Sequence, residues 1–121
     1  MPKTILIVED NELNMRLFSD LLQANGYDTI QSFDGSDAIE LAKKKQPNLI
    51  IMDIQLPEIS GIEITNLIKS DPRLAHIPII AVTAFASKGN KESIMKSGFS
   101  AYITKPVSIP NFLECVANFT A

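Results

Sequence analysis

Short apolar runs alternate along this chain with segments whose apolar residues recur every three or four positions. The runs cover residues 5–9, 27–32, 49–53, 77–83 and 101–104. A run in which almost every residue is apolar is typical of a strand that is buried on both faces of a parallel sheet. The runs therefore predict five strands, and the weaker alternation of residues 27–32 suits a strand at the edge of the sheet.

A helix is predicted after each strand. Leucines at positions 13, 17 and 21 share one face of a helix over residues 11–25, and Gly26 suits the position that follows its end. Further helices are predicted over residues 38–45, from residue 62, over residues 90–98 and, as a short last helix, from Ser108 onward. Five strand–helix units with short connections predict an α/β fold, a doubly wound, five-stranded parallel sheet with five helices.

Length and composition limit the classes of function. The 121 residues, 45% of them hydrophobic, suit one globular domain over residues 1–121 with no output domain. A net charge of −3 argues against a nucleic-acid partner, and apolar runs of at most four residues are too short for a membrane span. The single Cys115 excludes an internal disulfide and suits a reducing compartment. We therefore expect a cytoplasmic protein.

Polar residues follow the strands at the points where the strands end. Asp53 closes the third run and Glu9 and Asp10 close the first, while Thr83 and Lys105 close the fourth and fifth. The carboxyl ends of parallel strands share one edge of a sheet, so we expect these side chains to converge. Clustered carboxylates are costly without a cation, and oxygen ligands favour Mg²⁺, with Mn²⁺ and Ca²⁺ as substitutes. The alternative is a solvated acidic rim that binds nothing.

The same residues predict phosphoryl chemistry. An aspartate carboxylate is a competent nucleophile toward phosphorus, and the central Asp53 would become an aspartyl phosphate. Lys105 would hold a phosphoryl oxygen as a compact cation, and the Thr83 hydroxyl would donate a hydrogen bond to the phosphoryl group.

The chain resembles the receiver domains of bacterial two-component response regulators over essentially its full length. Asp53 and Thr83 are thirty residues apart, and Lys105 follows Thr83 by twenty-two, which is typical of that family. The segments that carry the resemblance are Ile7-Val8-Glu9-Asp10-Asn11, Met52-Asp53-Ile54-Gln55-Leu56-Pro57, Val82-Thr83-Ala84 and Lys105-Pro106.

This resemblance has implications that the residues alone do not supply. It implies a flavodoxin-like and CheY-like sheet with strand order 2-1-3-4-5. It implies that Mg²⁺ is held by Glu9, Asp10, Asp53 and the backbone carbonyl of Gln55, and that the Lys105–Pro106 peptide bond is cis. It also implies a partner that carries phosphohistidine, namely a sensor histidine kinase or phosphatase. The domain would then catalyse only its own phosphorylation and slow dephosphorylation, and would not be an enzyme in the usual sense.

The resemblance further implies how the signal leaves the domain. Thr83 would move toward the phosphoryl group and Tyr102 would occupy the vacated space, changing the surface of the fourth helix, fifth strand and fifth helix. A downstream protein would bind that surface, and the chain would be a monomer or a weak dimer. The candidate contacts on this surface are Lys88, Lys91, Met95, Phe99 and Phe112. The kinase would dock elsewhere, near Asn11, Leu13 and Asn14 at the start of the first helix.

Within the family the chain is most similar to DivK-type single-domain regulators of cell division and polarity. Two alternatives remain, a phosphorelay intermediate that only passes its phosphoryl group to a histidine phosphotransfer protein, and a chemotaxis-type regulator. Other classes fit poorly. A haloacid-dehalogenase-type phosphatase needs a second acid where Gln55 stands, and an FMN carrier needs a Ser-, Thr- and Gly-rich loop where Glu9-Asp10-Asn11-Glu12 stands.

Overall fold

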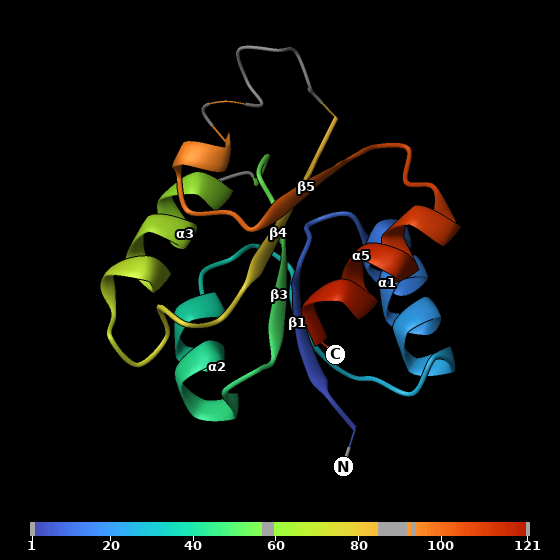
Figure 1. Cartoon of the computed structure of the whole chain (residues 1–121), viewed down its shortest axis with the longest axis horizontal. Coiled ribbons are helices and arrows are strands. Elements are labelled where there is room, and N and C mark those ends of the chain that lie inside the picture. Colours follow the sequence, from blue (N-terminus) through green and yellow to red (C-terminus); the bar gives the residue numbers. More distant parts are fainter. Residues whose placement is uncertain (1, 57–59, 85–91, 93, 121) are drawn as a thin grey trace.

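Five parallel strands form the centre of the molecule (Figure 1). The computed structural model describes residues 2–56, 60–84, 92 and 94–120. The strands pair in the order β2-β1-β3-β4-β5, which confirms the expected sheet and its strand order. Their bounds are β1 (Thr4–Val8), β2 (Asp28–Ser32), β3 (Leu49–Asp53), β4 (Ile79–Thr83) and β5 (Ala101–Thr104).

Helices follow the strands along the chain, and their bounds are α1 (Glu12–Ala24), α2 (Ala38–Lys45), α3 (Gly61–Ser70) and α5 (Ile109–Thr120). Where the fourth helix was expected, Glu92 and residues 94–96 are helical, and the expected start at Asn90 lies outside the described residues. The last helix is longer than predicted, at 12 residues, because Phe112, Val116 and Thr120 extend its buried face over three turns. In the described part of the chain, no helix has the length and apolar content needed to cross a bilayer.

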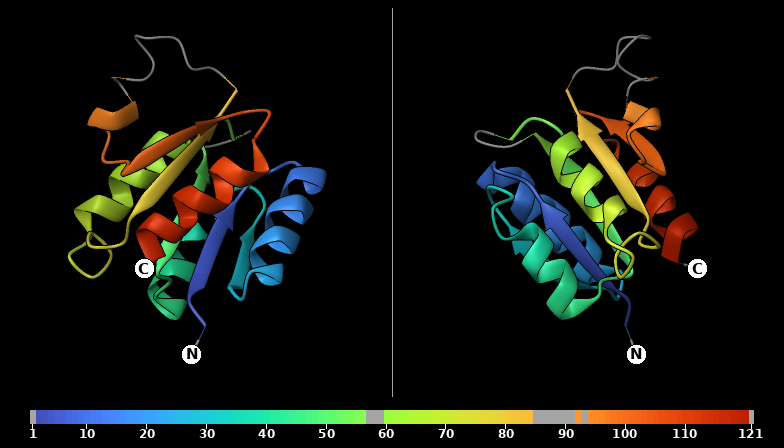
Figure 2. Two further views of the ribbon diagram at one scale, coloured as in Figure 1. Left: turned by 45° about the vertical axis from the view of Figure 1, so that its right-hand side comes forward. Right: turned by 90° about the vertical axis from the view of Figure 1, so that its left-hand side faces the viewer.

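The sheet separates two hydrophobic cores. Successive residues of a strand point to opposite faces, so Leu6 and Val8 face one core while Ile5 and Ile7 face the other. Figures 1 and 2 show α2 and α3 on the first side of the sheet and α1 and α5 on the second. Burial on both faces explains why the strands of the sheet centre are almost wholly apolar.

Local signals in the sequence place the element ends. The side chain of Asn11 accepts a hydrogen bond from the Asn14 N–H at 3.0 Å and so caps α1. Gly26, which follows the helix, has a φ of +88°, a value that glycine adopts without strain. β4 begins at Ile79 and not at Ile77 as predicted, because Pro78 has no N–H to donate to a neighbouring strand.

Candidate functional site

Two buried carboxylates lie at the carboxyl ends of the central strands. Glu9 follows β1 directly and Asp53 is the last residue of β3, and their exposed fractions are 1% and 3%. Side chains alternate along a strand, so Glu9 lies on the same face of the sheet as Ile5 and Ile7, and Asp53 on the same face as Ile51. This is the face that α1 and α5 cover. Asp10, one residue further along, is exposed.

The three acids converge as the sequence predicted. One carboxylate oxygen from each of Glu9, Asp10 and Asp53 lies within 4.8 Å of the other two. Among the His, Cys, Asp and Glu side chains of the described residues, these three form the group that is close enough to share a metal ion. The donors are all oxygens, which are the ligands of hard divalent cations such as Mg²⁺.

Lys105 lies against both buried acids. It follows β5, and its backbone N–H donates to the Thr83 carbonyl oxygen at 2.8 Å, which continues the ladder between β4 and β5. Its Nζ is 2.8 Å from Glu9 Oε1 and 3.3 Å from Asp53 Oδ2. The peptide bond that follows, Lys105–Pro106, is cis. One ammonium group therefore compensates two carboxylates.

Backbone groups complete the environment of the carboxylates. The Gln55 N–H donates to Asp53 Oδ1 at 3.0 Å, so both oxygens of Asp53 accept a hydrogen bond. Glu9 Oε2 accepts a long bond from the Asn11 N–H at 3.4 Å. Glu9 Oε1 is buried and has the Lys105 ion pair but no contact with good hydrogen-bond geometry, so it retains acceptor capacity for a further group.

Burial and charge shift two pKa values in this site. Burial raises the pKa of the Glu9 carboxyl, and the neighbouring Asp53 raises it further against the opposing effect of Lys105. Burial lowers the pKa of the Lys105 ammonium, but its close contact with Glu9 and the charges of Asp53 and Glu9 outweigh burial and raise it. Burial and Asp53 therefore oppose the charge on Glu9, whereas the two neighbouring acids favour the charge on Lys105.

Thr83 and Tyr102 lie on the other face of the sheet from Glu9. Asp53 pairs with Val82 in the β3–β4 register, so Thr83 is one residue beyond Asp53 toward the strand ends. Tyr102 pairs with Ala81, and Thr83 pairs with Thr104. Because side chains alternate, Thr83 and Tyr102 share the face that packs toward α2 and α3. Thr83 is buried and Tyr102 is half-buried.

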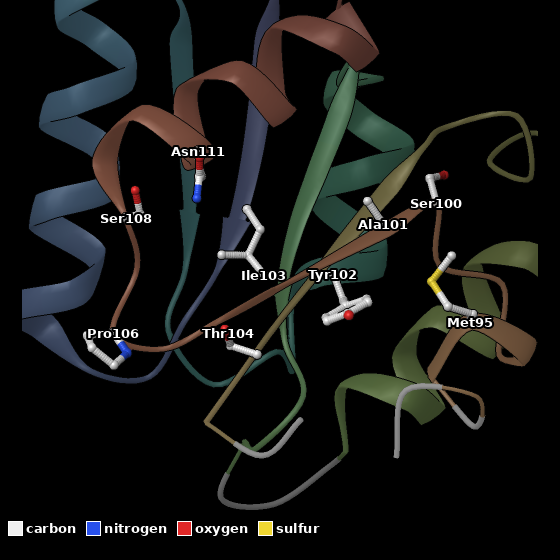
Figure 3. Close-up of a pocket in the computed structure, with 9 residues that line it drawn as sticks. All are labelled: Met95, Ser100, Ala101, Tyr102, Ile103, Thr104, Pro106, Ser108 and Asn111. Carbon is white, nitrogen blue, oxygen red and sulfur yellow. The ribbon is translucent and has the colours of Figure 1, made fainter. Parts of the chain in front are cut away.

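The surface beside β5 contains a pocket of about 520 Å³. Figure 3 shows Tyr102 on its β5 side and Met95 opposite, with Asn111 contributed by α5. The other lining residues are Ser100, Ala101, Ile103, Thr104, Pro106 and Ser108. The pocket is separate from the acidic cluster, because it includes neither Glu9 nor Asp53.

Two residues expected on this surface are instead part of the core. Phe99 is 4% exposed and Phe112 is fully buried, because the first packs into the core beside α3 and the second stacks on Phe18 at 5.0 Å between ring centroids. Met95 is exposed as expected, and Lys88 and Lys91 lie outside the described residues. Near the start of α1, Leu13 is exposed, as expected for a docking position.

The ion pair between Glu9 and Lys105 was not anticipated from the sequence. Lys105 was expected to hold a phosphoryl oxygen, whereas in the structure its Nζ contacts both acids and lies closer to Glu9 than to Asp53. The bond from the Gln55 N–H was missed as well. The type of residue at position 55 gives no signal for a contact made by its backbone.

Comparison with protein families gives one model that spans most of the chain. Residues 5–117 match the response regulator receiver domain. The polar-differentiation response regulator DivK of Brucella anthropi is 56% identical over 119 residues, which cover 98% of this chain and 97% of that protein. The protein of the same name from Brucella ovis is 55% identical with the same coverage.

Solved structures agree with this match. The receiver domain of a Pseudomonas aeruginosa sensor histidine kinase, with a magnesium ion coordinated in its active site cleft, superposes with a TM-score of 0.90 at 29% identity. The alignment covers 99% of this chain and 98% of that domain. The chemotaxis response regulator CheY4 of Vibrio cholerae has the same fold, with a TM-score of 0.92 at 24% identity over 98% of this chain and 99% of its own.

The raised pKa of Glu9 predicts how stability depends on pH in the absence of metal. The folded state holds a proton on Glu9 more tightly than the unfolded state does, so stability falls as pH rises from about 4.5 through the raised pKa. Glu9→Gln removes the buried charge, and in EDTA we expect it to raise Tm by roughly 2–6 °C at pH 8. The gain should vanish below pH 4.5.

Thermal unfolding followed by circular dichroism at several pH values measures this effect. Asp34→Asn is the matched control, because hydrogen bonds from Ser36 lower the pKa of the exposed Asp34 carboxyl. Its loss of charge should leave Tm unchanged or lower it at pH 8. A Glu9→Gln protein that melts below the wild type at pH 8 would mean that the ion pair with Lys105 outweighs the burial of Glu9.

Proposed function

Because this chain belongs to the family of response regulator receiver domains, we propose that Asp53 accepts a phosphoryl group from a sensor histidine kinase and so switches a protein-binding surface. The observation that carries the proposal is the buried Asp53 carboxylate, whose Oδ2 lies 3.3 Å from Lys105 Nζ. Glu9 and Asp10 lie beside it. An acceptor, a cation for the phosphoryl oxygens and a set of metal ligands are thus adjacent.

The acidic cluster would hold Mg²⁺, through Glu9, Asp10, Asp53 and the backbone carbonyl of Gln55. The all-oxygen donor set and the spare acceptor capacity of the buried Glu9 Oε1 fit a hard cation. When bound, Mg²⁺ supplies neutralising charge for the oxygens of the incoming phosphoryl group. Mn²⁺ or Ca²⁺ would occupy the same ligands.

The transfer step uses Asp53 as the nucleophile. A carboxylate oxygen of Asp53 forms a bond to phosphorus while the P–N bond of phosphohistidine breaks, and the bonding electron pair stays on the imidazole nitrogen. The Gln55 N–H holds Oδ1 and so fixes the rotation of the carboxylate. Lys105 exchanges part of its contact with the acids for a phosphoryl oxygen, as a compact ammonium can.

Phosphorylation would reach the distant surface through Thr83 and Tyr102. Both side chains lie on the sheet face toward α2 and α3, within two residue pairs along β4 and β5. A hydroxyl that moves toward the phosphoryl group leaves space beside β5, and Tyr102 borders the pocket there. A downstream protein that binds this side of the domain would then distinguish the two states.

The relatives suggest the biological role. They are named polar-differentiation response regulators, and one of them aligns over 97% of its own length. We therefore infer that this chain controls cell polarity and division through a kinase partner at the α1 side and a downstream protein at the β5 side.

The acceptor is tested by mass spectrometry of the intact protein after incubation with acetyl phosphate and Mg²⁺. We expect one phosphoryl adduct on the wild type and none on Asp53→Asn. In EDTA the wild type should form its adduct at least about tenfold more slowly, because a catalytic metal stabilises the transition state. Asp20→Asn, an exposed acid on α1, is the control and should react like the wild type. An adduct of equal yield on Asp53→Asn would place the acceptor elsewhere.

The switch is tested by backbone amide NMR shifts before and after acetyl phosphate. We expect shifts in Ala101, Tyr102 and Ile103 and none in β2 at the opposite edge of the sheet. Thr83→Ala should still form the adduct but lose most of the β5 response. Adduct formation without any change in β5 would contradict the switch and favour the phosphorelay intermediate.

The cellular role is tested by replacing the native gene with one that encodes Asp53→Asn. We expect misplaced or failed divisions, with normal division in cells that carry Glu40→Gln, which changes an exposed acid on α2. Altered swimming with normal division would instead support the chemotaxis-type regulator. Normal division and normal swimming would contradict a phosphorylation-dependent role in either process.

A further inference from the structure

The start of α3 lies unusually close to the backbone that carries Asp53. The Gly61 N–H donates to the Ile54 carbonyl oxygen at 3.0 Å. A Cβ atom placed on Gly61 would be 2.3 Å from the Asp53 carbonyl oxygen and 2.9 Å from Ile54 Cα. Both are backbone atoms, so no side-chain rotation would relieve the overlap. Glycine is required at position 61 because a side chain would have no space there. The backbone angle is not the reason, since the φ of Gly61 lies outside the left-handed region.

Neither the start of α3 nor the end of β3 can move easily, because other contacts hold each of them. α3 is fixed by Ile64 and Ile68, which are buried in the core, and by the Ser60 hydroxyl, which accepts a hydrogen bond from the Ile62 N–H at 3.1 Å. On the other side, the Ile54 N–H donates to the Val82 carbonyl oxygen at 3.1 Å and holds the end of β3 against β4. A methyl group at position 61 would have to displace one of them by about 1 Å to reach ordinary contact.

The backbone that would move carries the reacting carboxylate. The Asp53 carbonyl carbon is bonded to the Cα that bears the side chain, and the next peptide leads to Gln55. The Gln55 N–H holds Asp53 Oδ1 at 3.0 Å. A displacement of the Asp53–Ile54 peptide therefore changes the orientation of the carboxylate relative to Lys105 and to the incoming phosphorus.

We propose that Gly61 is a positioning residue for phosphoryl transfer: by lacking a side chain it lets α3 pack on the Asp53–Ile54 peptide and so fixes the Asp53 carboxylate for attack. This inference rests on the proposed function, since it concerns the rate of that transfer. Gly61 touches no reacting group, and it acts through Asp53 and Gln55.

The test compares Gly61→Ala with Gly26→Ala. Both replace a glycine by alanine, but Gly26 has no atom within 4 Å of the added Cβ and is strained only through its φ of +88°. Initial rates of adduct formation with acetyl phosphate at saturating Mg²⁺ are measured well below the Tm of each protein. We expect Gly61→Ala to react at least tenfold more slowly, since a misplacement of about 1 Å costs up to 100-fold. Gly26→Ala should stay within twofold of the wild type despite its lower Tm.

A second readout separates positioning from loss of stability. Hydrogen exchange at the Gln55 amide reports its bond to Asp53 Oδ1, and protection there should fall in Gly61→Ala but not in Gly26→Ala, while Ile50 and Ile51 in β3 stay protected in both. If Gly61→Ala does not fold alone, both measurements are made in trimethylamine N-oxide, which favours the compact state.

The outcomes are distinct. Gly61→Ala that reacts at the wild-type rate, or that slows only as much as Gly26→Ala, overturns the positioning role while the wild-type adduct still supports the proposed function. A wild type that forms no adduct refutes the proposed function and the positioning role with it.

Discussion

Two buried carboxylates, Glu9 and Asp53, share the single ammonium group of Lys105, and this unequal pairing governs the site. Two carboxylate charges whose oxygens lie within 4.8 Å of each other repel by roughly 3–4 kcal/mol at the effective dielectric constant of a protein. Glu9 and Asp53 are buried, and Lys105 contacts both of them at 2.8 and 3.3 Å. One positive charge leaves the cluster with an excess of negative charge once Asp10 is included. The cluster therefore favours a further cation. The pKa of Glu9 is raised mainly by burial and further by the neighbouring Asp53.

The strand order makes this cluster possible. β1 and β3 are neighbours at the centre of the sheet, so Glu9 and Asp53 emerge side by side at one edge. β5 is two strands away from β3, and the length of the lysine side chain spans the distance from Lys105 to both acids. The apolar cores on both faces hold the strand ends rigid, so the charges cannot separate to reduce their repulsion.

The residues of the site lie on two opposite faces of the sheet. Glu9 and Asp53 begin on the face of α1 and α5, whereas Thr83 and Tyr102 lie on the face of α2 and α3. In the proposed function, a partner that delivers a phosphoryl group would approach near α1 without covering the surface beside Tyr102. The close contact of Gly61 with Asp53 adds a third element, because it ties the start of α3 to the backbone of the acceptor. In the proposed function, input, output and positioning would thus use different helices around one carboxylate.

The residue pattern was enough to predict the strands and the acidic cluster at their ends. Apolar runs predicted the strands, with β3 and β5 correct at both ends, because strands buried on two faces leave a pattern in a single sequence. Acids at two strand ends predicted the cluster, because all parallel strands end at one edge. The family resemblance supplied the strand order and the cis bond at Lys105–Pro106, which the residues alone did not determine.

The contacts within the site follow from the packing of the whole chain and could not be predicted from residue types. This packing paired Lys105 more closely with Glu9 than with Asp53, placed the Gln55 N–H on Asp53 Oδ1, and brought Gly61 against the Asp53 carbonyl. It also buried Phe99 and Phe112, which sequence reasoning had placed on the surface. These contacts depend on differences of about 1 Å between residues on separate elements. A pattern of residue types fixes which face a side chain occupies, whereas packing of the whole chain fixes such distances.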